Sequence, residues 1–178
     1  EAMLKSDFIW YSGECMSCKT RCPRGNVPGT LISVVRSFSQ DLGYFTESEK
    51  GRQQLAIKRT IGEWILDHGY CLFPQGIEPE AHPEQGPVWS WINLKEVYGR
   101  FDATYQEEGP GILRKIPKDS LDELKRIFDI TGATERFDKI EEFSRIKAEE
   151  MGKEFSPGQK SEYYIYVYNT NNNRHGKD

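Results

Sequence analysis

The chain has 178 residues, a formal net charge of −4 and 29% charged residues. This length favours one domain with its own hydrophobic core. The acidic total excludes the global basic field that drives nucleic-acid binding, and no apolar stretch is long enough to span a bilayer. We therefore expect no membrane association through a spanning helix. Because no signal peptide is visible, we expect an intracellular protein, with secretion as the alternative.

The first third is predicted to contain a short strand and a helix. Asp7–Tyr11 is short and rich in aromatic residues, which is typical of a strand. A loop with several glycines and prolines covers Gly13–Gly29. Thr30 is the expected N-cap of a helix that stops at Gly43. The apolar residues of this helix recur at helical spacing: Leu31, Val34, Val35, Phe38 and Leu42.

A second helix is expected over Glu47–Asp67, followed by a short strand over Tyr70–Phe73. The inward stripe of that helix is expected to contain Leu55, Ile61 and Ile65. A polar loop with four prolines then covers Pro74–Pro87. After it we expect a helix from Asn93 to about Tyr105 and a half-exposed strand over Ile112–Ile116.

The last third is predicted to form two helices and one strand. Ser120–Ile130 and Thr134–Phe155 carry apolar residues at helical spacing and a charged exterior. Glu162–Tyr168 is rich in tyrosine and β-branched residues, which favours a strand. The tail, residues 169–178, is polar and expected to be flexible.

These elements predict an α+β fold, because the strands are scattered among helices without regular alternation and none is a continuous Val/Ile run. We expect a single globular domain over residues 1–168. About five helices would surround a small mixed sheet, with a cysteine-rich loop over residues 12–29 near the start.

The most concentrated chemistry is a group of thiols. The four cysteines are Cys15, Cys18, Cys22 and Cys71. A two-residue gap lets two thiolates turn toward one ion, as in zinc and iron–sulfur sites. Three basic residues lie beside these cysteines and would offset thiolate charge: Lys19, Arg21 and Arg24. The pattern indicates a metal site.

A tetrahedral ion needs a fourth ligand, for which Cys71 and His68 are the candidates. The four cysteines would form a closed four-thiolate set, and His68 in place of Cys22 would give a three-cysteine set. Either closed set indicates a structural zinc, because a catalytic zinc keeps one position open.

The segment Ser12-x2-Cys15-x2-Cys18-x3-Cys22-Pro23 resembles the cluster-binding run of bacterial-type ferredoxins, Cys-x2-Cys-x2-Cys-x3-Cys-Pro. It departs from that run at its first position, which is Ser12. The resemblance implies an iron–sulfur cluster as the alternative to zinc, with Cys71 completing the ligand set.

A third interpretation is a pair of disulfides in an exported protein, since the number of cysteines is even. Cys15 with Cys22, and Cys18 with Cys71, would be one of three pairings. Cys71 also fits a buried core thiol, because it lies between Tyr70 and Leu72.

Aromatic and basic residues in the second half suggest binding surfaces. Trp89 and Trp91 lie two residues apart, and so do Tyr164 and Tyr166, so each pair would share one face of an extended segment. The basic residues Arg114 and Lys115 keep nucleic-acid binding open. Core packing is the alternative for the aromatic residues.

No catalytic set is recognisable, although a loose acid–acid–lysine grouping in the second half keeps a metal-dependent nuclease open: Asp102, Glu107, Glu108 and Lys115. The leading hypothesis is a zinc-stabilised domain that recognises a protein or nucleic-acid partner. The alternatives are an enzyme, either an iron–sulfur redox protein or a nuclease, and a secreted disulfide-stapled effector or inhibitor.

Overall fold

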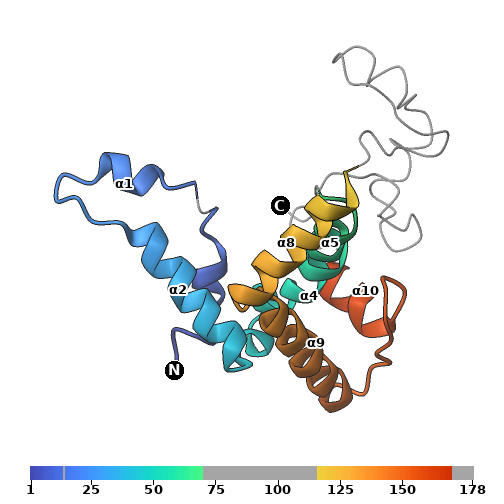
Figure 1. Ribbon diagram of the computed structural model, residues 1–178. Coiled ribbons are helices and arrows are strands. Elements are labelled where there is room, and N and C mark those ends of the chain that lie inside the picture. The colour runs from blue at the N-terminus through green and yellow to red at the C-terminus, as the bar shows by residue number, and fades with distance from the viewer. Residues whose placement is uncertain (14, 70–115, 170–178) are drawn as a thin grey trace, which may run out of the picture.

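The computed structural model describes residues 1–13, 15–69 and 116–169, and these ranges contain helices but no strand (Figure 1). The predicted α+β class with a mixed sheet is therefore wrong. The elements before residue 70 are η1 (Asp7–Trp10), α1 (Ser17–Arg21), α2 (Pro28–Asp41), η2 (Tyr44–Glu47), α3 (Glu49–Arg52), α4 (Gln54–Ile57), η3 (Lys58–Gly62) and α5 (Glu63–His68). Those after residue 115 are α8 (Lys118–Ile130), α9 (Ala133–Glu150) and α10 (Glu162–Asn169). The elements predicted between Tyr70 and Lys115 lie outside the described residues.

The predicted strand at Asp7–Tyr11 is instead the short 3-10 helix η1. The Ser6 side chain caps it by accepting a hydrogen bond from the Phe8 amide at 3.1 Å. Ile9 is buried, and its carbonyl accepts a hydrogen bond from Arg36 of α2 at 2.6 Å. Packing against α2 therefore outweighs the β preference of the aromatic residues.

The predicted strand at Glu162–Tyr168 is the helix α10. The Ser161 hydroxyl accepts a hydrogen bond from the Tyr164 amide at 3.2 Å, in the manner of an N-cap. Tyr163, Tyr164 and Val167 are fully buried. This spacing of one and three residues suits one face of a helix, whereas a strand would bury alternate residues.

The helix predicted to stop at Gly43 is confirmed as α2. It begins at Pro28, whose fixed backbone suits the first helical turn, so Thr30 lies inside the helix instead of capping it. Gly43 follows in the left-handed conformation, with φ 75°. A side chain there would collide with the Phe143 ring of α9, so the position also requires a glycine for packing.

The long helix predicted over Glu47–Asp67 is divided into α3, α4, the π-helical turn η3 and α5. A π turn inserts an extra residue and rotates everything that follows relative to the preceding turn. Leu55, before η3, is fully buried as predicted. Ile61, within η3, is 42% exposed, so its predicted place in the inward stripe is wrong.

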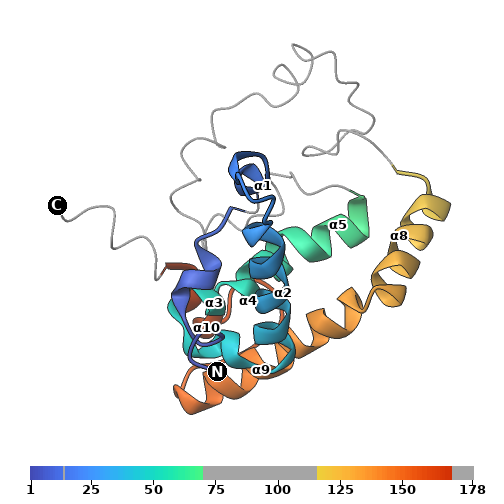
Figure 2. The same ribbon diagram turned by 90° about the vertical axis from the view of Figure 1, so that its left-hand side faces the viewer.

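The helices predicted at Ser120–Ile130 and Thr134–Phe155 are confirmed as α8 and α9, although α9 ends at Glu150. Gly132 joins them with φ 74°. Figure 2 shows α9 passing beneath α10, α4 and α2. The main core includes two residues of α9 and contains Phe45, Leu55, Ile140, Ala148, Tyr163 and Val167.

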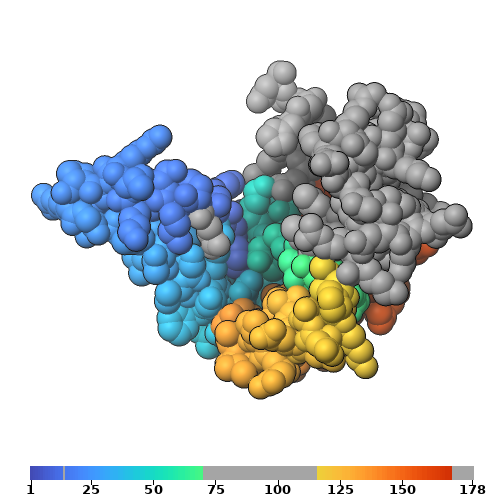
Figure 3. All heavy atoms as spheres, turned by 45° about the horizontal axis from the view of Figure 1, so that its top comes forward, coloured from blue at the N-terminus to red at the C-terminus, as the bar shows by residue number. Residues whose placement is uncertain are grey.

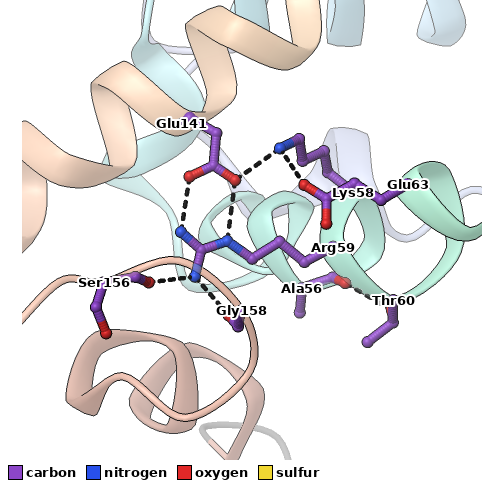
Figure 4. Close-up of polar contacts among 8 residues, drawn as sticks. All are labelled: Ala56, Lys58, Arg59, Thr60, Glu63, Glu141, Ser156 and Gly158. Atoms are coloured by element: carbon purple, nitrogen blue, oxygen red, sulfur yellow. Dashed lines mark hydrogen bonds and ion pairs between the residues drawn. The ribbon is translucent and has the colours of Figure 1, made fainter. Parts of the chain in front are cut away.

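A buried guanidinium joins η3, α9 and the segment before α10 (Figure 4). Arg59 donates two hydrogen bonds to the Glu141 carboxylate, at 2.9 and 2.7 Å. It also donates to the carbonyls of Ser156 and Gly158, at 2.9 and 2.6 Å. Lys58 donates to the same carboxylate at 2.8 Å. We call this set of five residues the Arg59 clamp.

The Arg59 clamp predicts a pH dependence of stability. Burial by itself would raise the pKa of Glu141, but the hydrogen bonds from Arg59 and Lys58 outweigh it and hold that pKa below its usual 4.5. A carboxyl group with a lowered pKa stabilises the fold above its unfolded-state pKa, and this contribution is lost as the pH falls through the folded-state value.

We therefore expect the urea midpoint of the wild type to fall between neutral pH and about pH 3.5, and to fall less in Glu141→Gln. Parallel midpoints for the two proteins across this range would contradict a lowered pKa at Glu141.

Among the residues that the structure describes, none of the helices combines the length and the apolar composition that a membrane span requires.

Candidate metal centre

The three clustered cysteines lie on an arm that extends from the helical body (Figures 1 and 3). We define the arm as residues 15–42, which include α1, the following loop, α2 and its C-cap residue. Cys15 precedes α1, Cys18 lies within it, and Cys22 is its C-cap. All three thiols are free, so the structure contains no bond between Cys15 and Cys22 of the kind that the disulfide interpretation proposed.

A tight turn separates the first two cysteines. Met16 adopts the left-handed conformation, with φ 56°, and is the only non-glycine residue with positive φ among the described residues. This conformation is uncommon for a residue with a side chain and indicates a turn constrained by its surroundings. The bend occurs in the two-residue gap, where thiolate ligands of one centre need the chain to turn.

The N-terminal end of α2 meets the middle cysteine. The Gly29 amide donates a hydrogen bond to Cys18 Sγ at 3.3 Å. A Cβ atom at Gly29 would lie 3.0 Å from Met16 Sδ and 3.4 Å from Cys18 Sγ. The absence of a side chain at Gly29 therefore allows its amide to approach the Cys18 sulfur closely. An N–H group at a helix N-terminus stabilises negative charge, and here it lies against the sulfur of a candidate metal ligand.

The Cys15 thiol is exposed and lies 3.3 Å from the Ser17 hydroxyl. The hydrogen bond between the Cys15 and Ser17 side chains, followed by that from the Ser17 backbone amide, lowers the pKa of Cys15. The thiolate is the form that binds metals, so this contact favours ligation.

Arg36 ties the start of the ferredoxin-like segment to α2. Its guanidinium donates to the carbonyls of Ile9 and Ser12, each at 2.6 Å. It also lies 5.4 Å from the centre of the Trp10 ring. Ser12, which stands at the first position of the cluster-binding run, is thereby held beside the arm.

The donor chemistry fits an iron–sulfur cluster, with three thiols in eight residues, an amide directed at one sulfur and cations nearby. In the conformation described, however, no three His, Cys, Asp or Glu side chains among the described residues gather around one point as metal ligands. His68 lies on α5 with its ring 4.1 Å from that of Trp64, and Figure 1 shows α5 well apart from α1. Cys71 lies outside the described residues.

The aromatic surface expected on Glu162–Tyr168 assumes a strand, whereas the segment is the helix α10. Because the segment is a helix, Tyr164 and Tyr166 do not share one face. Tyr164 is fully buried and stacks on Tyr168 at 6.3 Å, whereas Tyr166 is half-buried, 6.4 Å from Tyr163. The other predicted binding residues lie outside the described residues: Trp89, Trp91, Arg114 and Lys115. The same holds for the acidic residues of the nuclease alternative, Asp102, Glu107 and Glu108.

Sequence reasoning missed two residues of α2 at this site: Gly29, which contacts Cys18, and Arg36, which holds the Ser12 backbone. The composition of the loop predicts Gly29 as its last residue. One sequence signal could have identified this glycine as part of the first turn of a helix. Pro28 and Gly29 come directly before an apolar pattern with helical spacing, and proline is common in a first helical turn. No local signal identifies Arg36, because its partners precede it by 27 and 24 residues.

Comparison with known proteins gives one informative similarity. The chain is 26% identical over 151 residues to a subunit of the ferredoxin:CoB-CoM heterodisulfide reductase of Methanosarcina acetivorans. The match covers 85% of this chain but only 54% of the relative, so the chain spans about half the length of that protein. No family model and no solved structure matches the chain. The relative is by its name a subunit of a reductase, and it gives no support to the hypothesis of a zinc-stabilised recognition domain.

Proposed function

We propose that this chain is an electron-transfer subunit of a redox enzyme and binds an iron–sulfur cluster through Cys15, Cys18 and Cys22. The observation that carries the proposal is the Gly29 amide directed at Cys18 Sγ, within a segment that resembles a ferredoxin cluster-binding run. The similarity to part of a heterodisulfide reductase supports the same conclusion independently.

Each residue of the site has a distinct part in this proposal. The three cysteine sulfurs hold the cluster, and the Gly29 amide offsets negative charge on the Cys18 sulfur. Arg36 fixes the Ser12 backbone beside them. When bound, an iron–sulfur cluster supplies reversible one-electron transfer. Ser12 and Cys71 are the two candidates for the remaining ligand.

The proposed setting is a complex of several proteins. The relative is named as one subunit of an enzyme whose name includes ferredoxin, so we infer that this chain also works with other subunits and with a ferredoxin-type carrier. In that setting the chain receives one electron from a donor protein and passes it to an acceptor.

Anaerobic purification with measurement of iron, acid-labile sulfide and zinc tests the proposal. We expect iron and sulfide in matching amounts, a broad visible absorption band and a paramagnetic signal after reduction. Changing Cys18 to Ser should abolish all of these, because a serine oxygen is a harder ligand than a thiolate. The matched control is Thr20→Ala, which changes a residue between Cys18 and Cys22 and should retain the wild-type cluster.

Two variants identify the remaining ligand. If Cys71 completes the set, Cys71→Ser should lose iron as Cys18→Ser does. If Ser12 completes it, Cys71→Ser should retain the cluster, and Ser12→Cys should sharpen its spectrum. One zinc per chain with no visible band would contradict the proposed function altogether.

A further inference from the structure

The arm carries an apolar surface that no described element covers. Three side chains of α2 and that of its C-cap residue, spaced by three or four residues, lie along one side of the helix: Leu31, Val34, Phe38 and Leu42. They are 62%, 46%, 55% and 54% exposed, respectively. We call them the apolar stripe. A helix in a folded domain ordinarily buries such a stripe, and a contiguous exposed apolar patch is characteristic of a binding surface.

The arm also has an unusual charge distribution. From Cys15 to Gln40 there is no Asp or Glu, while the segment contains Lys19, Arg21, Arg24 and Arg36. Since the whole chain has a net charge of −4, the residues outside this segment sum to −8. The arm is therefore a positive region on an otherwise acidic protein.

Three of these cations are available to a partner. Lys19, Arg21 and Arg24 are exposed, and none forms an ion pair with any residue in the described part of the chain. Arg36, in contrast, is occupied by the carbonyls of Ile9 and Ser12. The three available cations lie on and after α1, at the end of the arm where α2 begins.

The apolar stripe begins beside the thiols. Leu31 is two residues after Gly29, whose amide contacts Cys18 Sγ at 3.3 Å. A protein seated on the stripe would therefore lie next to the cysteines, with the three cations at the same end of the interface. Apolar centre and charged rim are the usual composition of a protein–protein interface.

We propose that the arm is the docking surface for an acidic electron-carrier protein, with the apolar stripe at its centre and Lys19, Arg21 and Arg24 at its rim. The acidity of the partner follows from charge complementarity, which steers association between oppositely charged surfaces. A nucleic acid would instead require a longer row of cations along its phosphates, and the arm offers three. That the partner carries electrons rests on the proposed function, whereas its acidity does not.

The test is calorimetric titration of the intact, anaerobically purified protein with a purified ferredoxin of strongly negative net charge. We expect saturable binding that weakens about tenfold or more between about 25 and 300 mM NaCl, because salt screens the rim charges. A basic cytochrome c, used as the carrier of opposite charge, should show no saturable binding under the same conditions.

Two arm variants separate the contributions of rim and centre. The double variant Arg21→Glu/Arg24→Glu reverses rim charge and should weaken binding about tenfold or more, mainly by slowing association. Val34→Asp places a charge in the apolar stripe and should have a comparable effect through faster dissociation. All of these positions are exposed, so folding should be retained.

Matched controls lie on other helices. Lys125→Glu/Arg126→Glu reverses two exposed cations of α8, and Ile146→Ser removes an apolar side chain of α9 that is 38% exposed. Both should bind ferredoxin as the wild type does. Equal weakening by arm and control variants, or no saturable binding by the wild type, would overturn the docking proposal.

Cluster content, recorded from visible absorbance for every sample, separates the two proposals. A chain that holds a cluster but does not bind ferredoxin would overturn docking and leave the proposed function standing. A chain that lacks a cluster but shows salt-sensitive binding dependent on the arm would overturn the proposed function and support an acidic protein partner.

Discussion

Replacing Arg59 with methionine is expected to lower the free energy of unfolding by about 3–5 kcal/mol, because it leaves a carboxylate and two carbonyls without their shared partner. The Arg59 side chain is 2% exposed, and it makes all four of its polar contacts with residues distant in sequence. It also lies 4.8 Å from the centre of the Phe155 ring. At this chain length the loss corresponds to a decrease in Tm of about 10 °C.

Urea or thermal unfolding followed by circular dichroism measures this effect. The matched control is Arg145→Met, which removes an arginine from α9 whose pair with Glu149 is 2.6 Å long but whose side chain is 49% exposed. We expect the control to lower the free energy of unfolding by about 0.5 kcal/mol or less, since exposed helical ion pairs contribute little to stability. Equal midpoints for Arg59→Met and the wild type would show that the Arg59 clamp does not hold η3 to α9.

Gly51→Ala is expected to destabilise the protein by about 2–4 kcal/mol, through overpacking and the weakening of a helix cap. An added Cβ would overlap the carbonyl oxygen of Phe45 and lie 2.5 Å from Ser48 Oγ. The Ser48 hydroxyl caps α3 by accepting a hydrogen bond from the Gly51 amide at 3.0 Å. Because Phe45 is a fully buried core residue, its backbone cannot move away without disturbing the core.

The control for this prediction is Gly13→Ala, where an added Cβ has no neighbour within 4 Å and the backbone is not left-handed. Its effect on the urea midpoint should stay within about 0.5 kcal/mol of the wild type. A similar small effect for Gly51→Ala would mean that the turn between η2 and α3 can relax, contrary to the close packing described above.

The cysteine segment shows how far sequence reasoning reaches into the site. The spacing of Cys15, Cys18 and Cys22 is enough to select this segment as a candidate metal site, because ligands close in sequence are constrained by local geometry alone. The Gly29 amide that contacts Cys18 comes from α2, and the pairing of Arg36 with Ile9 and Ser12 depends on how the chain folds back. Only the tertiary structure could identify them.

The tyrosine-rich segment Glu162–Asn169 shows where local preference misleads. Tyrosine, isoleucine and valine favour strands, and their density predicts one. The structure forms a helix instead, in which Tyr163 and Val167 are buried in the main core and Tyr164 is buried against Ala56. Burial of three large side chains outweighs β preferences of about 1 kcal/mol or less.

The sequence by itself determined where several helices stop and which segment carries the thiols. Gly43, Gly69 and Gly132 occupy left-handed positions that other residues avoid, and α8 and α9 follow from helical periodicity, so these features depend on nearby residues alone. The tertiary structure decided the rest. It made two predicted strands helical, joined Arg59 to Glu141 across 82 residues and left the apolar stripe of α2 exposed. Each depends on contacts between distant residues, whose free energy exceeds local preferences and is not encoded at any single position.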